Sequence, residues 1–105
     1  QYHKGQIMQK IEYKINKGKK SESRELKIID LKWKDFCKST DLAIKISNPN
    51  GSQFTDIANL VMLYTGKKDE DMMKWKDSCK DQADFINEIS EAFSAITNHI
   101  ESKKK

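Results

Sequence analysis

Apolar residues recur every three or four positions along most of this chain, which is the spacing of one helix face. Four such stretches are separated by short polar breaks. The first stretch contains Ile7, Met8, Ile11 and Ile15, and it is followed by Gly18. Glycine is the usual residue at a left-handed helix C-cap. The pattern therefore predicts a short first helix that ends before this glycine.

The second stretch predicts a longer helix. Ser21 or Ser23 can cap its first amides, and the apolar pattern continues to about Ile46. Its apolar stripe consists of Leu26, Ile29, Trp33, Phe36, Thr40 and Ala43. We expect this stripe to face a partner helix.

The third stretch follows the strongest break in the chain, Asn48-Pro49-Asn50-Gly51. Ser52 is placed to cap the helix after this break, and Gly66 is placed to end it. The stripe of this helix consists of Phe54, Ile57, Ala58, Val61 and Tyr64.

The fourth stretch is the longest. Asp69, Glu70 and Asp71 place negative charge at its start, where the helix dipole is positive. The stripe then runs through Met72, Trp75, Cys79, Gln82, Ile86, Ile89, Phe93, Ile96 and Ile100. This pattern predicts one continuous helix, roughly 45–50 Å long at 1.5 Å per residue. The second helix is expected to lie along it.

Two segments of the chain are nearly identical. Residues 31–38 and 73–80 share six of eight positions, and both cysteines and both tryptophans lie in them. This match favours an internal duplication in which Cys37 and Cys79 form one disulfide, although lysine-rich matches also arise by coincidence. The predicted fold is all-α: about four helices form two αα-hairpins in one domain, residues 1–105, with half-units at about 6–47 and 52–102.

Composition narrows the classes of function. Hydrophobic residues make up 36% of the chain, so the core is expected to be thin. The net charge is +4, and Arg24 is the only arginine. Base-edge recognition favours arginine, so we expect no sequence-specific nucleic-acid binding. No apolar run reaches the length of a membrane span.

The chain carries no motif for catalysis or metal binding. His3 and His99 lie at opposite ends, and the cysteines lack the Cys-x-x-Cys spacing of zinc sites. There is no glycine-rich phosphate loop and no nucleophile elbow. We therefore expect a protein that is not an enzyme, with no catalytic residues, no metal and no cofactor.

Lysines give the main candidate for a binding surface. Lys32, Lys34, Lys74 and Lys76 flank the two tryptophans and predict two similar basic patches. The partner predicted from these charges is a protein with an acidic surface, with a polyanionic glycan as an alternative. Tyr2, Tyr13 and Tyr64 are candidate aromatic anchors.

Three features favour a secreted, extracellular protein. The chain begins at Gln1, Asn50-Gly51-Ser52 is a glycosylation sequon at Asn50, and two cysteines allow one disulfide. We expect a small non-enzymatic protein that binds or inhibits a macromolecular partner by protein–protein contact, in a setting such as host defence or haemostasis. The alternatives are a carrier of a small apolar ligand in the bundle and an intracellular helical adaptor.

Overall fold

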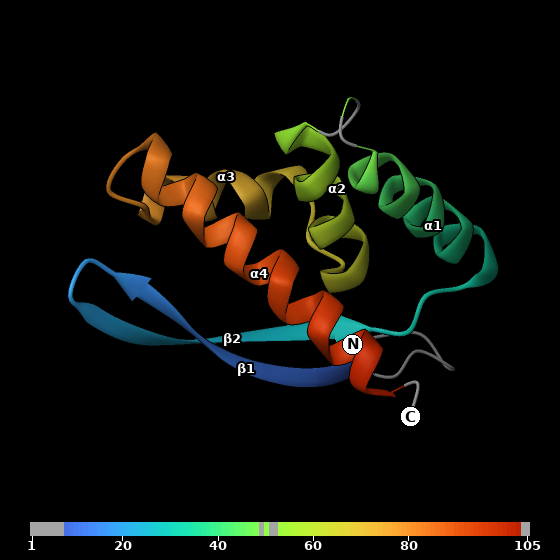
Figure 1. Ribbon diagram of the computed structural model, residues 1–105, viewed down its shortest axis with the longest axis horizontal. Coiled ribbons are helices and arrows are strands. Elements are labelled where there is room, and N and C mark those ends of the chain that lie inside the picture. Colours follow the sequence, from blue (N-terminus) through green and yellow to red (C-terminus); the bar gives the residue numbers. More distant parts are fainter. Residues whose placement is uncertain (1–7, 49, 51–52, 104–105) are drawn as a thin grey trace.

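The chain folds into a β-hairpin followed by four helices (Figure 1). The computed structural model describes residues 8–48, 50 and 53–103. In chain order its elements are β1 (Met8–Lys17), β2 (Lys20–Ile29), α1 (Trp33–Ser47), α2 (Phe54–Thr65), α3 (Asp69–Ser78) and α4 (Gln82–Lys103). The fold is therefore mixed α/β, and the prediction of an all-helical bundle of two αα-hairpins is wrong.

The hairpin is antiparallel and closes through a tight turn. Ile11 lies opposite Leu26, Tyr13 opposite Arg24, and Lys17 opposite Lys20. Only two residues separate the strands, and the first of them, Gly18, has a φ of +65°. A positive φ at that position is what a type II′ hairpin turn requires. The left-handed glycine was predicted, but it turns a hairpin and does not cap a helix.

The first predicted helix is wrong because its spacing fits two structures. Ile11 and Ile15 are four residues apart, which places them on one face of a helix and also on one face of a strand. The neighbouring polar residues favour a strand, since Lys10, Glu12 and Lys14 alternate with the positions of Ile11 and Ile15. These three side chains are exposed on the outer face of the hairpin.

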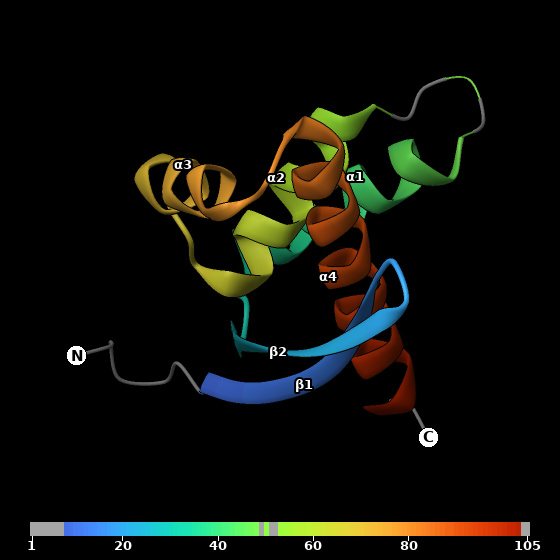
Figure 2. The same ribbon diagram turned by 90° about the vertical axis from the view of Figure 1, so that its left-hand side faces the viewer.

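Helices cover only the inner face of the hairpin. In Figure 1 α4 crosses the hairpin, and Figure 2 shows the two strands curving around it. α4 contacts β1, α2 contacts β2 and α4, α1 packs on α2, and α3 packs on α4. The buried apolar side chains come from the hairpin, α2 and α4: Ile11, Ile15, Leu26, Ile28, Leu60, Val61, Ile89, Ala92 and Ile96.

The long fourth helix of the prediction is broken in two at residues 79–81. The carboxylate of Asp81 accepts a hydrogen bond from the Asp84 N–H at 2.8 Å, and the Asp84 carboxylate accepts one from the Lys80 N–H at 3.0 Å. Carboxylates that satisfy free backbone amides in this way start a helix. The start signal Asp81-x-x-Asp84 is present in the sequence, but the apolar pattern continues across it and hides it.

The two similar segments do not share a structure. Residues 33–38 form the first turns of α1, whereas residues 73–78 form the end of α3. The Trp33 side chain is 75% exposed, while the Trp75 ring packs edge-on against Phe85 with centroids 6.2 Å apart. The internal repeat is therefore a likeness of sequence and not of structure.

The predicted disulfide is also wrong. Cys37 lies in α1 and Cys79 follows α3, and both thiols are free. Figure 1 shows α1 and α3 on opposite sides of α2. The Cys79 thiol instead donates a hydrogen bond to the Trp75 carbonyl at 3.3 Å.

Other sequence predictions are confirmed. α2 ends at Gly66, which has a φ of 72° and donates its N–H to the Met62 carbonyl at 2.8 Å. The acidic triplet Asp69, Glu70 and Asp71 forms the first turn of α3. Within the described part of the chain, no helix combines the length and the hydrophobicity needed to cross a membrane.

We expect both cysteines to be alkylated in protein that has never been reduced, with Cys79 reacting more slowly. Burial, together with Asp84 and Glu88, raises the pKa of the Cys79 thiol and so lowers its thiolate fraction. Mass-spectrometric alkylation kinetics on the parent and on Cys79→Ser will separate the two rates. A Cys37–Cys79 linked peptide in unreduced material would contradict the structure.

Replacing Asp81 with alanine should lower the free energy of unfolding by about 1 kcal/mol, because α4 loses its N-terminal cap. Urea denaturation followed by circular dichroism measures this change. Asp77→Ala is the matched control, since Asp77 lies near the end of α3 and caps no helix start. Equal stabilities of the two variants would show that α4 does not depend on this cap.

Candidate functional site

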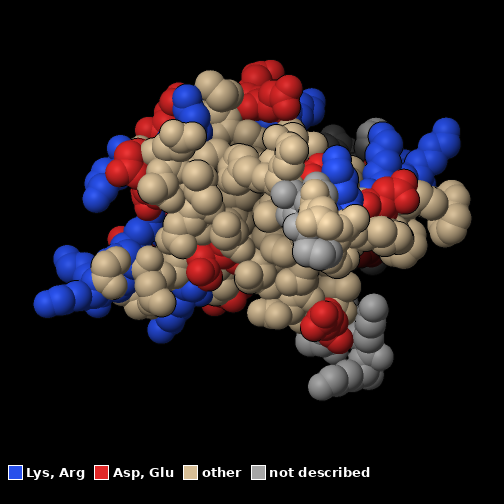
Figure 3. Space-filling view, turned by 45° about the horizontal axis from the view of Figure 1, so that its top comes forward, with Lys and Arg blue, Asp and Glu red and all other residues tan. Residues whose placement is uncertain are grey.

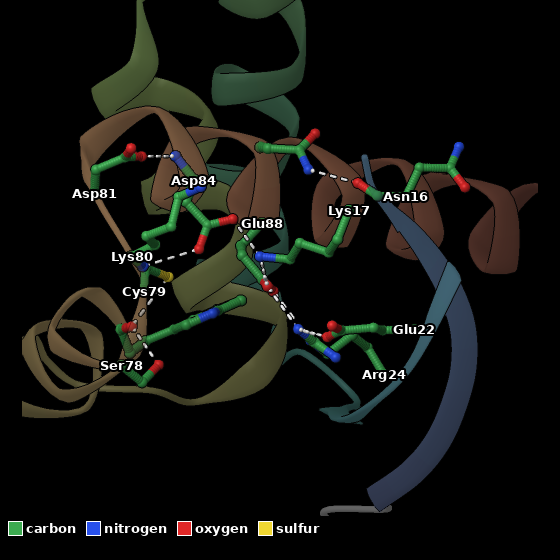
Figure 4. Close-up of polar contacts among 12 residues, drawn as sticks. Asn16, Lys17, Glu22, Arg24, Ser78, Cys79, Lys80, Asp81, Asp84 and Glu88 are labelled. Atoms are coloured by element: carbon green, nitrogen blue, oxygen red, sulfur yellow. Dashed lines mark hydrogen bonds and ion pairs between the residues drawn. The ribbon is translucent and has the colours of Figure 1, made fainter. Parts of the chain in front are cut away.

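Two regions of the surface are candidates for a functional site. The first is a charged cleft between the hairpin turn and the corner that joins α3 to α4, with a volume of about 960 Å³. Figure 4 shows its side chains reaching from the hairpin towards α4. The second is the outward face of α1. Because catalysis and binding make different demands, the state of the ionisable groups decides what each region can do.

Glu88 of α4 is the centre of the charged cleft. It is only 3% exposed, and Arg24 of β2 donates to both of its carboxylate oxygens, at 3.2 and 2.8 Å. The Lys17 ammonium group lies 2.8 Å from the same carboxylate and also pairs with Asp84. Arg24 in turn pairs with Glu22 at 2.8 Å. These bonds fasten the turn end of the hairpin to the first half of α4.

We call Glu88, Asp84 and Lys17 the charged cluster; their ion pairs hold all three in their charged forms. Burial alone would raise the pKa of Glu88, but the hydrogen bonds from Arg24 and Lys17 outweigh it and hold that pKa below its usual value. The hydrogen bond from Lys17 lowers the pKa of Asp84, and the same contact raises the pKa of Lys17. No member of the cluster is therefore poised to exchange a proton near neutral pH.

The neighbouring groups are equally unsuited to chemistry. Burial, with a contribution from Glu88, raises the pKa of Tyr13 to about 12, so its hydroxyl stays protonated. The raised pKa of Cys79 keeps a thiol and not a thiolate at neutral pH. In the parts of the chain that the structure describes, no three His, Cys, Asp or Glu side chains gather as metal ligands. The charged cleft is a structural junction.

The outward face of α1 is apolar. On the side packed against α2, Ser39 is buried and Leu42 and Ile46 are partly buried. On the opposite side of the helix, four side chains follow steps of four, three and four residues: Trp33, Cys37, Thr40 and Ile44. We call these four residues the outer stripe. Trp33 and Ile44 are 75% and 65% exposed, so large apolar surfaces face water.

An aromatic pair occupies one end of the outer stripe. The rings of Trp33 and Phe36 stack with centroids 6.1 Å apart and planes inclined by 26°. Phe36 is itself 49% exposed. Single exposed apolar residues are ordinary, but a group of large ones on one helix face marks an interaction site.

The structure does not bring the four predicted lysines into one patch. Lys32 and Lys34 lie at the start of α1, while Lys74 and Lys76 lie in α3, on the other side of α2 in Figure 1. Lys76 is in the last turn of α3, where the helix dipole favours a cation, and it lies 3.5 Å from Asp77. In Figure 3 basic, acidic and uncharged side chains lie together at the right-hand end, the side on which α1 lies in Figure 1.

Lys32 and Lys34 are placed against the rule for helix stability. Lys32 is the N-cap residue of α1 and Lys34 is in the first turn, where the dipole disfavours positive charge. Neither side chain forms an ion pair with any residue that the structure describes. Residues that break a local rule without compensation are expected at functional surfaces.

The tyrosines do not lie on this surface. Tyr13 and Tyr64 pack against the core, and the Tyr64 hydroxyl donates to Ser39 Oγ at 3.3 Å. Tyr2 lies outside the described residues. Asn50 is exposed, and its N–H bonds to the Asn48 side chain at 3.0 Å. Gly51 and Ser52 of the sequon also lie outside the described residues, so glycosylation of Asn50 stays a prediction.

Sequence reasoning missed the outer stripe. It assigned Trp33, Phe36 and Thr40 to a buried stripe that continued from Leu26. The buried stripe and the outer stripe can be told apart by spacing. The outer stripe has its own helical spacing, from Trp33 through Cys37 and Thr40 to Ile44. A helix with apolar residues on two sides packs against two neighbours, and among the described elements α2 is the neighbour that α1 packs on most closely.

Comparison with known proteins adds no further identification. No protein family, curated protein or solved structure matches this chain.

Replacing Glu88 with glutamine should lower the free energy of unfolding by about 1–3 kcal/mol at pH 7, because two cations lose their shared carboxylate. The pKa of Glu88 is lowered in the folded state from an ordinary value of 4.5. Its contribution is therefore present above about pH 4.5 and is lost as the pH falls below that value. Urea denaturation of the parent and of Glu88→Gln at pH 7 and pH 3 will measure this.

The stability difference between the two proteins should shrink at pH 3. Glu101→Gln is the matched control, because Glu101 is exposed on the same helix and its replacement should change stability little. A difference that is the same at both pH values would exclude the Glu88 carboxylate as its source.

Proposed function

We propose that this chain is a small non-enzymatic binding protein that acts on a macromolecular partner by protein–protein contact, and that the outward face of α1 is its contact surface. The observation that carries the proposal is the 75% exposure of Trp33, stacked on Phe36 and aligned with Ile44. Tryptophan is among the residues most enriched in the energetic centres of protein interfaces. Burying this stripe under a partner would remove its contact with water.

The state of the ionisable groups supports binding over catalysis. Glu88, Asp84 and Lys17 are fixed in their charged forms, and Tyr13 and Cys79 in their neutral forms. A general acid or base works best with a pKa near the operating pH. The charged cleft is walled by these paired charges, which also disfavours the carriage of an apolar ligand there.

The charges around α1 favour a partner with an acidic surface. Lys32 and Lys34 stand beside Trp33, and opposite charge on a partner would speed association and set its orientation. An extracellular setting is also part of the proposal, but since the cysteines are free it now rests on the Asn50 sequon.

A photo-crosslinking amino acid at position 33 should capture a partner protein in material from the source of this chain. The same amino acid at position 14 is the matched control, because Lys14 is exposed on the outer face of the hairpin. We expect a discrete adduct from position 33 that is absent from position 14, as seen by mass spectrometry. The adduct should also weaken when Ile44 is replaced by Asp, because a charge would then interrupt the stripe.

Equal adducts from both positions, or none from position 33, would contradict the proposal. The Ile44→Asp variant should remain folded, since Ile44 is 65% exposed. Its circular dichroism spectrum should match that of the parent.

A further inference from the structure

We propose that the occupant of the outer stripe is an amphipathic helix of a partner protein, with carboxylates beside the Trp33 end of α1. This inference rests on the proposed function and adds to it the shape and the charge of the partner.

The spacing of the stripe matches a helix–helix seam. Trp33, Cys37, Thr40 and Ile44 follow steps of four, three and four, which is the pattern by which one helix interlocks with another. α1 has 15 residues and is therefore about 22 Å long at 1.5 Å per residue. The stripe extends over most of this length, so a single partner helix lying along α1 would cover it.

Positive charge is concentrated at the aromatic end of the stripe. Lys32 and Lys34 are exposed there, and Lys38 is exposed near the middle of the stripe. None of the three is ion-paired among the described residues. At the other end, Lys45 already lies 3.2 Å from Asp56. The unsatisfied cations therefore favour glutamate or aspartate on the partner near Trp33, and not near Ile44.

The acidic residues of α1 do not cancel this charge. Asp35 is partly buried and lies one turn before Ser39, on the side of α2. Asp41 is exposed, but it lies one turn after Lys38, towards Ile44. Asp30 is exposed two residues before Lys32, so residues 30–38 carry three lysines against two aspartates and keep a local excess of one positive charge.

A second copy of this chain fits the stripe less well. Pairing two α1 helices in parallel would bring Lys32 and Lys34 against the same lysines of the copy. An antiparallel pair would bring the Trp33 end of one copy beside the Ile44 end of the other, where Lys45 is already paired with Asp56 and Asp41 is exposed. Like charges oppose the parallel pair, and the antiparallel pair offers Asp41 as its one exposed carboxylate on α1 towards that end, so a partner helix with several carboxylates fits these lysines better.

An anionic membrane also fits less well. Helices that lie in a membrane interface combine a broad apolar face with a strongly basic polar face. The outer stripe of α1 is narrow, includes Thr40, and has Asp41 on its basic edge. A protein helix can match a narrow seam and pair selectively with Lys32, Lys34 and Lys38.

Selection from a displayed library of amphipathic helices tests the inference. The library peptides carry a fixed leucine seam, and the positions flanking the seam are randomised among Glu, Asp, Gln, Lys and Arg. We expect selected peptides to be enriched in Glu and Asp towards one end, and labelled copies to bind the parent protein in fluorescence anisotropy. Trp33→Ala should weaken that binding at least tenfold.

Matched lysine variants test the position of the charge. Lys32→Gln with Lys34→Gln should weaken binding of the acidic peptides severalfold and reduce its salt dependence. Lys74→Gln with Lys76→Gln makes the same change in net charge on α3 and should leave binding unchanged. The first pair should keep or slightly raise the melting temperature, because it removes cations from a helix N-terminus.

Selected peptides with neutral or basic flanks, or peptide binding that does not depend on Trp33, would overturn the inference. Equal effects of the two lysine pairs would also overturn it. So would Trp33-dependent binding to phosphatidylserine vesicles without binding to any peptide. Concentration-dependent dimerisation through α1 in sedimentation would overturn it in favour of a second copy. A position-specific adduct from residue 33 together with a failed selection would leave the proposed function standing and reject the helical, acidic partner alone.

Discussion

The fold depends on the packing of α4 against one face of the β-hairpin. Two strands alone are at best marginally stable in water, so the hairpin needs a covering layer. Ile11 and Leu26 supply its apolar contact, and Ile89, Ala92 and Ile96 of α4 complete it. Beyond the apolar core, Glu88 holds Arg24 and Lys17, which fixes the turn end of the hairpin on the same helix. Packing and ion pairs therefore act on one junction.

The same arrangement leaves α1 on the outside. α2 and α4 share the inner face of the hairpin, and among the described elements α1 packs mainly on α2. A helix in this position needs only one apolar side, yet α1 has two. Trp33 and Ile44 are 75% and 65% exposed, and Lys32 and Lys34 oppose the dipole of their helix. These two features are the basis of our proposal that this face makes an external contact.

Helical spacing predicted the parts of the fold whose apolar pattern fits one period only. α2 and its C-cap Gly66 were predicted, and the helical assignment of residues 33–46 was correct. The hairpin was missed because Ile11 and Ile15 satisfy the periods of a helix and a strand together, and local propensity alone does not decide between them. The break before α4 was missed because the Asp81 cap lies within an uninterrupted apolar pattern.

The prediction of a disulfide was wrong for a tertiary reason, since α1 and α3 lie on opposite sides of α2. The sequence predicted two separate basic patches, and the structure places Lys32 and Lys34 at the start of α1 and Lys74 and Lys76 in α3; their role in binding stays a prediction.

The two tryptophans offer the most direct test of the claim that α1 is the contact surface. Each indole N–H gives its own NMR signal, and Trp33 is exposed on α1 whereas Trp75 packs against Phe85 in the body of the protein. The isotope-labelled protein is titrated with the partner that photo-crosslinking identifies. This titration should shift or broaden the Trp33 signal and leave the Trp75 signal in place. A shift of the Trp75 signal with an unchanged Trp33 signal would contradict the account and move the contact surface to α3.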